Sequence, residues 1–428
     1  MPDGPILDYL AKKGDNMRRT TLTLLIQILF LYSGIALAAT DALDIFGNAN
    51  MDDVIDEDDV EYVQGIIDEI NEATELADAN YDGEINQEDI TQIEAIIDGE
   101  AAKITLIDSV GRIMTVNVPV ERVISLHMRH ASAICALGGK EMIVGVDDTV
   151  IERELLFPYL CKLPSVGKVR EPDAEQIIIL DPDLIVTFTN MPTSAELEDK
   201  LHGSVAVIRF DLSRAKDIKE EMIKLGYLIG DRNAAEDYTE WYDLYMDTVK
   251  ERVFEIPEED RPLVFMERER SGEVQIMRWA YATDTGYSDL CDVAGGVNVA
   301  QGYVEYNGDV ESEWVMTQNP DVIVGLSYGA GYKKDDDTPL KDYRDKIMDV
   351  PGFDNLEAVK NGRVHVISGD FAVGPQLVIG AVAMAKWLYP EEFEDMDVDA
   401  IHEEFLKGFL GSDYDLEEHG AFVYPPVE

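Results

Sequence analysis

Residues 175–186 read EQIIILDPDLIV and residues 313–324 read EWVMTQNPDVIV, and this repeated stretch decides the fold. Each copy predicts a short helix, a turn at Pro-Asp and an uninterrupted apolar run rich in β-branched residues. Such a run is typical of a parallel strand buried on both faces, because helices cover both sides of a parallel sheet. The repeat therefore predicts two similar Rossmann-like α/β lobes, at residues 103–232 and 256–428.

A second repeat and a long helix complete this architecture. CALGG at 135–139 matches CDVAGG at 291–296, and in both a helix is expected to end at the glycines. Residues 233–255 contain no Gly or Pro and place apolar side chains at helical spacing, which predicts one long linker helix. Two α/β lobes on a stiff linker form a cleft walled by the loops that follow the strands, where α/β sheets bind ligands.

The composition excludes several classes of protein. The chain has 428 residues, with 87 Asp or Glu against 35 Lys or Arg, and a formal net charge of −52. A nucleic-acid binder is excluded because phosphate contacts need clustered Lys and Arg. Three cysteines are too few for a disulfide scaffold. The acid excess is spread along the chain, which indicates a solvated surface in a salty medium.

The N-terminus has the parts of an export signal. Arg18 and Arg19 precede an uncharged run over residues 20–39 that contains Ala36-Leu37-Ala38, a small-residue cleavage pattern. The run is also nearly long enough to span a bilayer if it is retained. We expect residues 1–39 to be a signal peptide or an N-terminal anchor. The mature protein would then be secreted or anchored at the outer face of the cytoplasmic membrane.

Two loops in residues 40–100 have the spacing of calcium ligands. The second loop, DANYDGEINQED at 78–89, places oxygen-bearing side chains at alternate positions, and the first, NANMDDVIDEDD at 48–59, repeats the spacing. Calcium takes six to eight hard oxygens, which alternate positions on a tight loop supply. The expected ligands are Asn48, Asn50, Asp52, Val54 through its carbonyl, Asp56 and Asp59, and Asp78, Asn80, Asp82, Glu84, Asn86 and Asp89.

An amphipathic helix follows each loop. This short duplicated loop–helix unit, with Asp rather than Glu at the last ligand position, resembles a type I dockerin more than an ordinary EF-hand. The resemblance implies a small all-α domain at residues 40–100, calcium as its cofactor and a cohesin domain as a partner. A purely structural calcium module is the alternative.

Five blocks after residue 103 resemble an ABC-transporter solute-binding protein. They lie at 104–126, 136–148, 163–186, 294–302 and 358–375, beginning with ITLIDSVGRIMTVNVPVERVISL. The type they resemble is the iron-siderophore, haem and cobalamin class with a single helical linker. The resemblance implies a protein that is not an enzyme, captures a metal chelate and delivers it to a permease in the cytoplasmic membrane.

Candidate ligand-binding residues follow the predicted strands. Imidazole and phenol ligate iron, guanidinium pairs with anionic groups, and aromatic rings stack on a macrocycle. Each candidate has an alternative role as an ordinary surface or packing residue. Family members often have an arginine where this chain has Gln376, which argues against tight binding of an anionic siderophore. The candidates are His127, Arg129, His130, Arg170, Arg278, Trp279, Tyr281, Tyr328, Tyr332, Phe371 and Gln376.

The predicted function is the capture of a siderophore-like iron chelate. The same class of protein also carries corrinoids, haem or metal oxyanions, so these ligands stay open. A cohesin-docked structural subunit of the cell surface, without a transport role, is an alternative of a different class. No GxSxG, HExxH or P-loop pattern is present, so no catalytic function is predicted.

Glu175 and Glu313 occupy equivalent places in the two lobes. Each lies seven residues before the Pro of the repeated Pro-Asp turn, near the start of a predicted helix. An acid is favoured there by the helix dipole alone. In the family resembled, a glutamate at this point of each lobe meets arginines of the permease. We therefore expect Glu175 and Glu313 to dock the protein on its permease.

Overall fold

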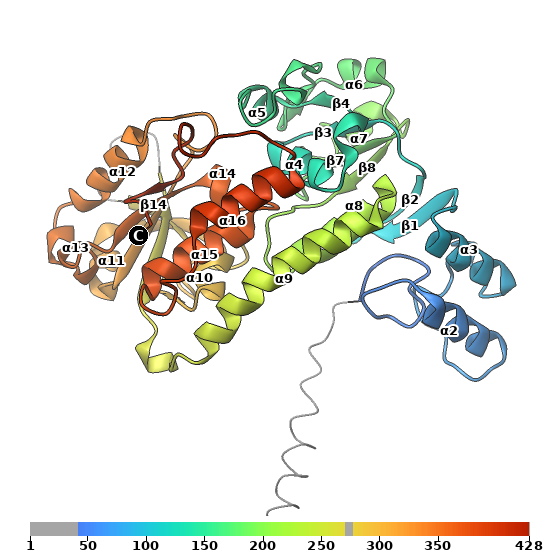
Figure 1. The fold of residues 1–428 in the computed structure, drawn as a ribbon, viewed down its shortest axis with the longest axis horizontal. Helices are drawn as coiled ribbons and strands as arrows, with labels where there is room; N and C mark the ends of the chain where they lie inside the picture. The colour runs from blue at the N-terminus through green and yellow to red at the C-terminus, as the bar shows by residue number, and fades with distance from the viewer. Residues whose placement is uncertain (1–41, 270–276, 428) are drawn as a thin grey trace, which may run out of the picture.

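A computed structural model describes residues 42–269 and 277–427. Figure 1 shows two α/β lobes joined by a long helix, with a small helical unit beside the N-terminal lobe. The fold class predicted from the sequence is confirmed. The signal or anchor expected over residues 1–39 lies outside the described part of the chain. Within that part, no helix combines the length and the apolar character needed to cross a membrane.

The N-terminal lobe contains a four-stranded parallel sheet with the order β4-β3-β7-β8. Its strands are β3 (Val123–Ser125), β4 (Ile143–Val146), β7 (Leu184–Thr187) and β8 (Ala206–Arg209). Its helices are α4 (Met128–Ala136), α5 (Asp148–Ile151), α6 (Ala174–Leu180), α7 (Glu198–Leu201) and α8 (Ile218–Ile229). Two hairpins are separate from this sheet: β1 (Lys103–Ile107) with β2 (Ile113–Asn117), and β5 (Gly167–Lys168) with β6 (Glu171–Pro172).

The C-terminal lobe contains a mixed sheet with the order β12-β10-β9-β13-β14-β15, in which β11 also pairs with β9. Its strands are β9 (Leu263–Arg268), β10 (Met277–Tyr281), β11 (Val297–Asn298), β12 (Asn307–Glu311), β13 (Val322–Ser327), β14 (Val364–Ser368) and β15 (Val423–Tyr424). Its helices are α10 (Gly286–Val293), α11 (Ser312–Gln318), α12 (Thr338–Met348), α13 (Glu357–Lys360), α14 (Gly369–Ala372), α15 (Leu377–Leu388) and α16 (Val398–Glu404). Strands β9, β13 and β14 are parallel and form the buried centre.

The sequence repeat is also a structural repeat. Helix α6 ends at Asp181 (φ 46°, ψ 62°) and α11 at Asn319 (φ 45°, ψ 62°), both in the left-handed conformation. Asp and Asn tolerate this conformation better than other side chains do, which is why each copy turns at this residue before Pro-Asp. The buried strands β7 and β13 then follow.

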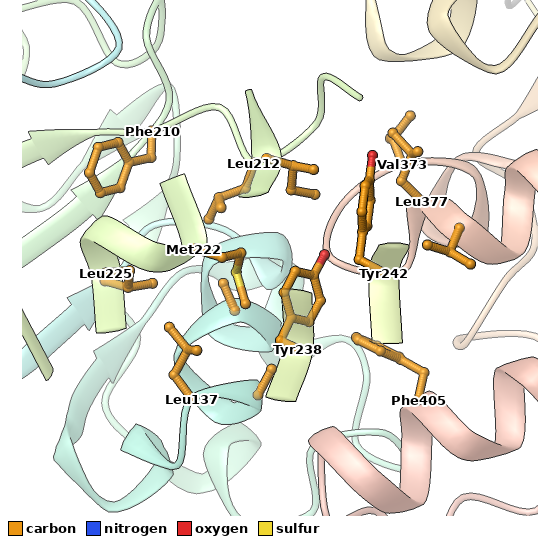
Figure 2. Packing of buried hydrophobic residues seen from close by; sticks show 14 of the residues in the cluster. Leu137, Phe210, Leu212, Met222, Leu225, Tyr238, Tyr242, Val373, Leu377 and Phe405 are labelled. Carbon is orange, nitrogen blue, oxygen red and sulfur yellow. The ribbon is translucent and has the colours of Figure 1, made fainter. Parts of the chain in front are cut away.

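The linker predicted over 233–255 is helix α9 (Arg232–Phe254). Tyr238 and Tyr242 are almost fully buried on its inner face. Figure 2 shows them between side chains of the N-terminal lobe and Val373, Leu377 and Phe405 of the C-terminal lobe. The Tyr238 hydroxyl donates to the Pro375 carbonyl at 2.8 Å, and the Tyr242 hydroxyl to the Ala215 carbonyl at 3.0 Å. Helix α9 is therefore pinned to both lobes.

The N-terminal helical module (residues 42–100) contains α2 (Glu57–Ile67) and α3 (Gln87–Asp98). A capping box begins each helix, formed by Asp56 with Asp59 and by Asn86 with Asp89. The module is fused to the N-terminal lobe: the Phe46 amide donates to the Thr105 carbonyl, and its apolar side chains share one continuous hydrophobic cluster with that lobe.

Candidate functional site

Two cavities lie between the lobes and share Arg129 as a wall residue. The large chamber has a volume of about 510 Å³, and aromatic residues of both lobes line it, among them Phe188, Tyr281, Tyr287 and Tyr306. The small chamber has a volume of about 190 Å³ and is lined by His127, Arg153, Tyr328, Lys333 and Asp370. Together these chambers form the candidate cleft.

Helix α4 places His127 and Arg129 in the cleft. His127 is the N-cap residue, and its Nδ1 accepts a hydrogen bond from the Arg129 amide at 3.3 Å. Burial, and then the nearby Arg129, hold the pKa of His127 well below its ordinary value of 6.5. The imidazole is therefore neutral near pH 7, with Nε2 carrying the proton. The Arg129 guanidinium lies 5.7 Å from the Phe188 ring centroid.

Three tyrosines of the C-terminal lobe lie across the cleft from these residues. The hydroxyls of Tyr287 and Tyr328 are 3.1 Å apart, and the rings of Tyr281 and Tyr287 are 5.0 Å apart. Arg129 Nη2 donates to the Tyr287 hydroxyl at 3.2 Å, which links the two lobes. Burial raises the pKa of Tyr281 and Tyr287, so both phenols are neutral and can donate as well as accept.

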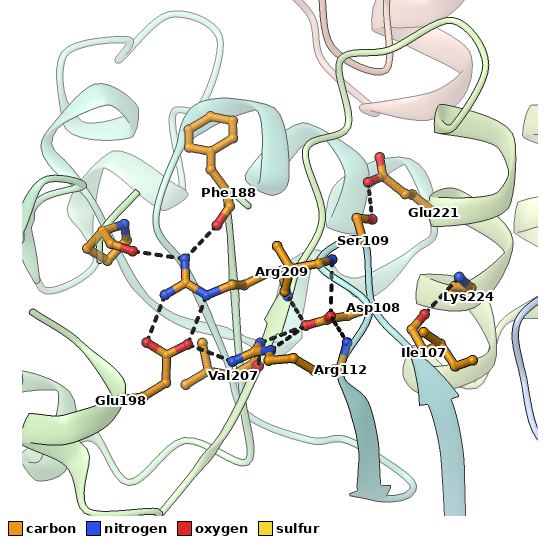
Figure 3. A network of polar contacts seen from close by, with 12 residues as sticks. Ile107, Asp108, Ser109, Arg112, Phe188, Glu198, Val207, Arg209, Glu221 and Lys224 are labelled. Atoms are coloured by element: carbon orange, nitrogen blue, oxygen red, sulfur yellow. Dashed lines mark hydrogen bonds and ion pairs between the residues drawn. The ribbon is translucent and has the colours of Figure 1, made fainter. Parts of the chain in front are cut away.

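A buried network fixes the loop that carries Phe188 into the large chamber. Figure 3 shows Arg209 at its centre, and its Nη1 donates to the carbonyls of Phe188 and Pro192, both at 2.8 Å. The other guanidinium nitrogens bind the Glu198 carboxylate at 2.9 and 2.8 Å, and Arg112 binds the same carboxylate at 2.9 Å. Because the guanidinium fork has fixed geometry, Arg209 holds the cleft loop in one position.

Ion pairs between described residues of the two lobes cross the cleft, and two arginines form the closest of them. Arg153 of the N-terminal lobe binds Asp370 of the C-terminal lobe through two bonds, at 2.9 and 2.6 Å, and both side chains are less than one-tenth exposed. Arg214 binds Asp289 at 2.8 Å and Asp284 at 3.2 Å. A cleft with a positive group, aromatic walls and linked lobes can hold a small, partly aromatic ligand.

The family described as "Periplasmic binding protein" matches residues 123–370, from β3 into the helix that follows β14. The chain belongs to this periplasmic binding protein family. The family supplies the solute-binding component of ABC transporters, so this chain is a transport protein that acts outside the cytoplasmic membrane, and not an enzyme.

Named relatives of this periplasmic binding protein share about a fifth to a quarter of its residues. It is 22% identical over 311 residues to the ABC transporter substrate-binding lipoprotein YvrC of Bacillus subtilis, covering 69% of this chain and 88% of the relative. It is 24% identical over 338 residues to the molybdate-binding protein MolA of Haemophilus influenzae, covering 72% and 91%. The structure of the TroA-like periplasmic binding protein FepB from Veillonella parvula matches with a TM-score of 0.61 and 22% identity, covering 74% of this chain and 98% of that one. These likenesses support the two-lobed fold.

Four of the residues predicted for the binding site of this periplasmic binding protein line its cleft: His127, Arg129, Tyr281 and Tyr328. Three others lie elsewhere. His130 is buried, with Nε2 2.9 Å from the Phe210 carbonyl. Arg170 is exposed, in the turn between β5 and β6. Arg278 is buried in the C-terminal core, where its guanidinium pairs with Glu267.

The last four candidates are also outside the two chambers, because their side chains are used for packing. Tyr332 lies 2.6 Å from His402 Nε2, and the Phe371 ring packs against His402 at 5.2 Å. Gln376 Nε2 donates to the Asp370 carbonyl at 2.5 Å. The Trp279 ring lies under the Arg268 guanidinium at 4.5 Å.

Sequence reasoning missed Tyr287, Tyr306, Phe188 and Arg153, which line the cleft. Tyr287 sits in the first turn of α10, between Thr285 and Ser288, which form a capping box. Thr is a residue type favoured at helix N-caps, so Thr285 shortly after a predicted strand is a signal for a helix start at the cleft edge. Arg153 follows a short helix, and nothing in its local sequence separates it from a surface arginine.

The two loops of the N-terminal helical module have matching hydrogen bonds. Asn50 and Asn80 accept from the amide two residues later, at 3.0 and 2.9 Å, and Asp52 and Asp82 do the same, at 3.0 and 2.9 Å. The last ligand positions, Asp59 and Asp89, are fully buried. Over residues 42–269 and 277–427, no group of three His, Cys, Asp or Glu side chains is placed so that it could hold a metal ion by itself. The predicted calcium ligands also include Asn side chains and the Val54 carbonyl, so calcium binding stays a prediction.

Proposed function

We propose that this periplasmic binding protein captures a siderophore-like iron chelate and delivers it to an ABC permease. The observation that carries the proposal is Arg129 facing Tyr281, Tyr287 and Tyr328 across the cleft. Ferric chelates present anionic oxygens and flat chelate rings, which suit a guanidinium and aromatic side chains. A volume of about 510 Å³ lies within the usual range for small-molecule sites.

A titration tests this proposal. A ferric trihydroxamate is added to the purified chain, and quenching of the tryptophan and tyrosine fluorescence is followed. We expect saturable quenching with a dissociation constant of about 1 µM or below, a free energy of roughly −8 kcal/mol. The iron-free trihydroxamate is the control and should bind more weakly. Absence of saturable quenching by any ferric chelate would contradict the proposal.

A metal oxyanion is the second candidate, because Arg129 offers an anion site and the relative MolA is named for molybdate binding. A small oxyanion would fill only a minor part of the large chamber, which favours a chelate. Calorimetric heat with molybdate and none with ferric chelates would support the oxyanion instead. A visible absorbance band in the purified protein would indicate haem, a corrinoid or a ferric chelate, and the shape of the spectrum with the metal content would distinguish them.

We also propose that the N-terminal helical module is dockerin-like and binds two calcium ions, with a cohesin domain as its partner. Two features support calcium. Asp59 and Asp89 are fully buried carboxylates at the last ligand position of each loop, and residues 41–100 contain 21 acids but no Lys or Arg. Each of these carboxylates accepts two backbone hydrogen bonds but forms no ion pair with a described residue, and a divalent ion would offset the remaining cost of its burial.

A third proposal concerns docking on the permease. Glu175 and Glu313 are exposed in the first turns of α6 and α11, one on each lobe. Equivalent acids on the two halves of a pseudo-symmetric protein suit two equivalent basic sites on a dimeric permease. The three proposals place ligand capture, calcium and docking on separate parts of the chain.

A further inference from the structure

Most of the charged side chains that line the two chambers are already compensated. In the small chamber Arg153 is paired with Asp370, and Lys333 lies 3.9 Å from Glu152. In the large chamber Arg214 binds two aspartates, Asp284 and Asp289. A guanidinium with carboxylate partners has little electrostatic attraction left for a ligand. These three cations therefore contribute little to the binding of an anionic ligand.

Arg129 is the exception among the lining residues that the structure describes. Arg129 is half-buried and lines both chambers. Among the described residues, its guanidinium forms one hydrogen bond, to the neutral Tyr287 hydroxyl, and no ion pair with a carboxylate. The other nitrogens of the guanidinium are thus available to one anionic group of a ligand.

Asp211 is the corresponding uncompensated acid in the large chamber. Its Oδ1 accepts from the Thr189 amide at 3.3 Å and from the Thr189 hydroxyl at 2.9 Å, and no described cation forms an ion pair with it. The large chamber therefore offers one free positive group and one free negative group. A ligand with several negative charges would bring its surplus charges against Asp211 without a cation to offset them.

We propose, on the basis of the proposed function, that the cleft selects ferric chelates with a net charge near zero. One anionic group of the chelate binds Arg129, and an amine or N–H donor faces Asp211. Polyanionic chelates are disfavoured at the site itself, and the net charge of −52 repels them further during approach. Arg129 and Asp211 are then the residues that determine charge specificity.

The test compares three ferric complexes of similar size: a neutral trihydroxamate, the same trihydroxamate with one pendant carboxylate, and a tris-catecholate of charge −3. We expect the carboxylate form to bind tightest and the tris-catecholate to bind at least about tenfold more weakly, because its surplus negative charges face Asp211. Arg129→Gln should weaken the carboxylate form about tenfold and leave the neutral form within about twofold. Asp211→Asn should strengthen binding of the tris-catecholate.

Two further variants separate local from general effects. Lys168→Gln removes an exposed positive charge on β5, outside the cleft, and should change none of the three affinities. Arg129→Lys keeps the charge and should keep the order of affinities, which separates a charge effect from a folding defect. Tightest binding of the tris-catecholate, or equal weakening by Arg129→Gln and Lys168→Gln, would overturn the inference. If none of the three chelates binds, the proposed function itself fails and the inference fails with it.

Discussion

Asp147, which precedes α5, is a fully buried acid close to the cleft. Its Oδ1 accepts a hydrogen bond at 2.6 Å from Thr149, a wall residue of the small chamber, and its Oδ2 has no hydrogen-bond partner within the described structure. Burial raises the pKa of Asp147 from 3.8 to about 7, although Thr149 and Arg153 act in the opposite direction. The folded state therefore binds a proton that the unfolded chain releases near pH 4.

The raised pKa predicts a pH-dependent contribution to stability. Below pH 4 the contribution of the protonated Asp147 is fully present, and it is lost as the pH rises through about 7. Asp147→Asn should remove this component. The difference in free energy of unfolding between wild type and variant, from urea denaturation, should therefore change between pH 4 and 7 and become constant above pH 8. Asp342→Asn, at an exposed position of α12, is the control and should show a constant difference. A constant difference for Asp147→Asn would contradict the prediction.

Part of the cleft could be predicted from the sequence, because ligand-binding residues of α/β proteins lie at or just after the ends of strands. His127 follows β3, Tyr281 ends β10 and Tyr328 follows β13. The same signal also selected His130 and Arg278, whose partners are the Phe210 carbonyl and Glu267. Neither partner is identifiable without the fold. The pairing of Arg153 with Asp370, 217 residues apart, is likewise created by the closure of the two lobes.

At the scale of elements, the helices and strands that depend on a local sequence pattern could be predicted from the sequence. The repeat of α6–β7 and α11–β13, and the linker helix α9, follow from apolar spacing and Pro-Asp turns. Strands of two residues, such as β5, β11 and β15, have no local signal, because pairing with neighbours across the fold creates them. The packing of the N-terminal helical module on the lobe was not predicted for the same reason.

The calcium loops yield a prediction on the full chain, since the module shares its hydrophobic cluster with the lobe. Addition of a calcium chelator should lower the melting temperature, because ions that bind only the folded state stabilise it. Asp89→Ala should reduce the difference between chelator and calcium, and Asp59→Ala combined with Asp89→Ala should abolish it. Asp98→Ala, an exposed acid of α3 outside the loop, should preserve it. Equal melting temperatures for wild type with calcium and with chelator would show that the loops do not bind the ion.

The helix-terminal glutamates yield a second prediction at this scale. Glu175→Ala combined with Glu313→Ala should leave chelate affinity unchanged, because both residues lie outside the cleft. The double variant should fail to stimulate ATP hydrolysis by the permease in vesicles, since the docking charges are lost. Glu251→Ala, an exposed acid of α9, is the control and should stimulate normally. Full stimulation by the double variant would show that the two glutamates do not dock the permease and only stabilise the starts of their helices.

For the whole molecule, the linker predicts limited movement. Helix α9 runs without a break over Arg232–Phe254, and Tyr238 and Tyr242 tie it to the C-terminal and N-terminal lobes respectively. The buried Arg153–Asp370 pair links the lobes a second time. A hinge movement in either direction would require bending this helix, and opening the cleft would also break that pair. We expect small-angle scattering to show no clear fall in radius of gyration on ligand binding, and a distinct fall would contradict this.

The acidic surface predicts dependence on salt. With a net charge of −52, self-repulsion should destabilise the folded chain at low ionic strength. The melting temperature should rise with KCl, mostly below about 0.5 M, since the screening length falls from about 10 Å at 0.1 M to about 3 Å at 1 M. A rise confined to molar salt would indicate salting-out of apolar surface instead. A melting temperature independent of KCl would contradict the repulsion.

The junction between the N-terminal helical module and the lobe bears on how this chain was assembled in evolution. Leu43 and Ile45 are almost fully buried, and Ile45 pairs with Leu106 of β1. A module packed in this way is not readily exchanged between proteins, because each recipient protein would need a complementary apolar surface for Leu43 and Ile45. Residues 42–100 grafted through a flexible linker onto another binding protein should therefore give lower soluble yield than the native arrangement. The module and its lobe are expected to have diverged together, as one inherited unit.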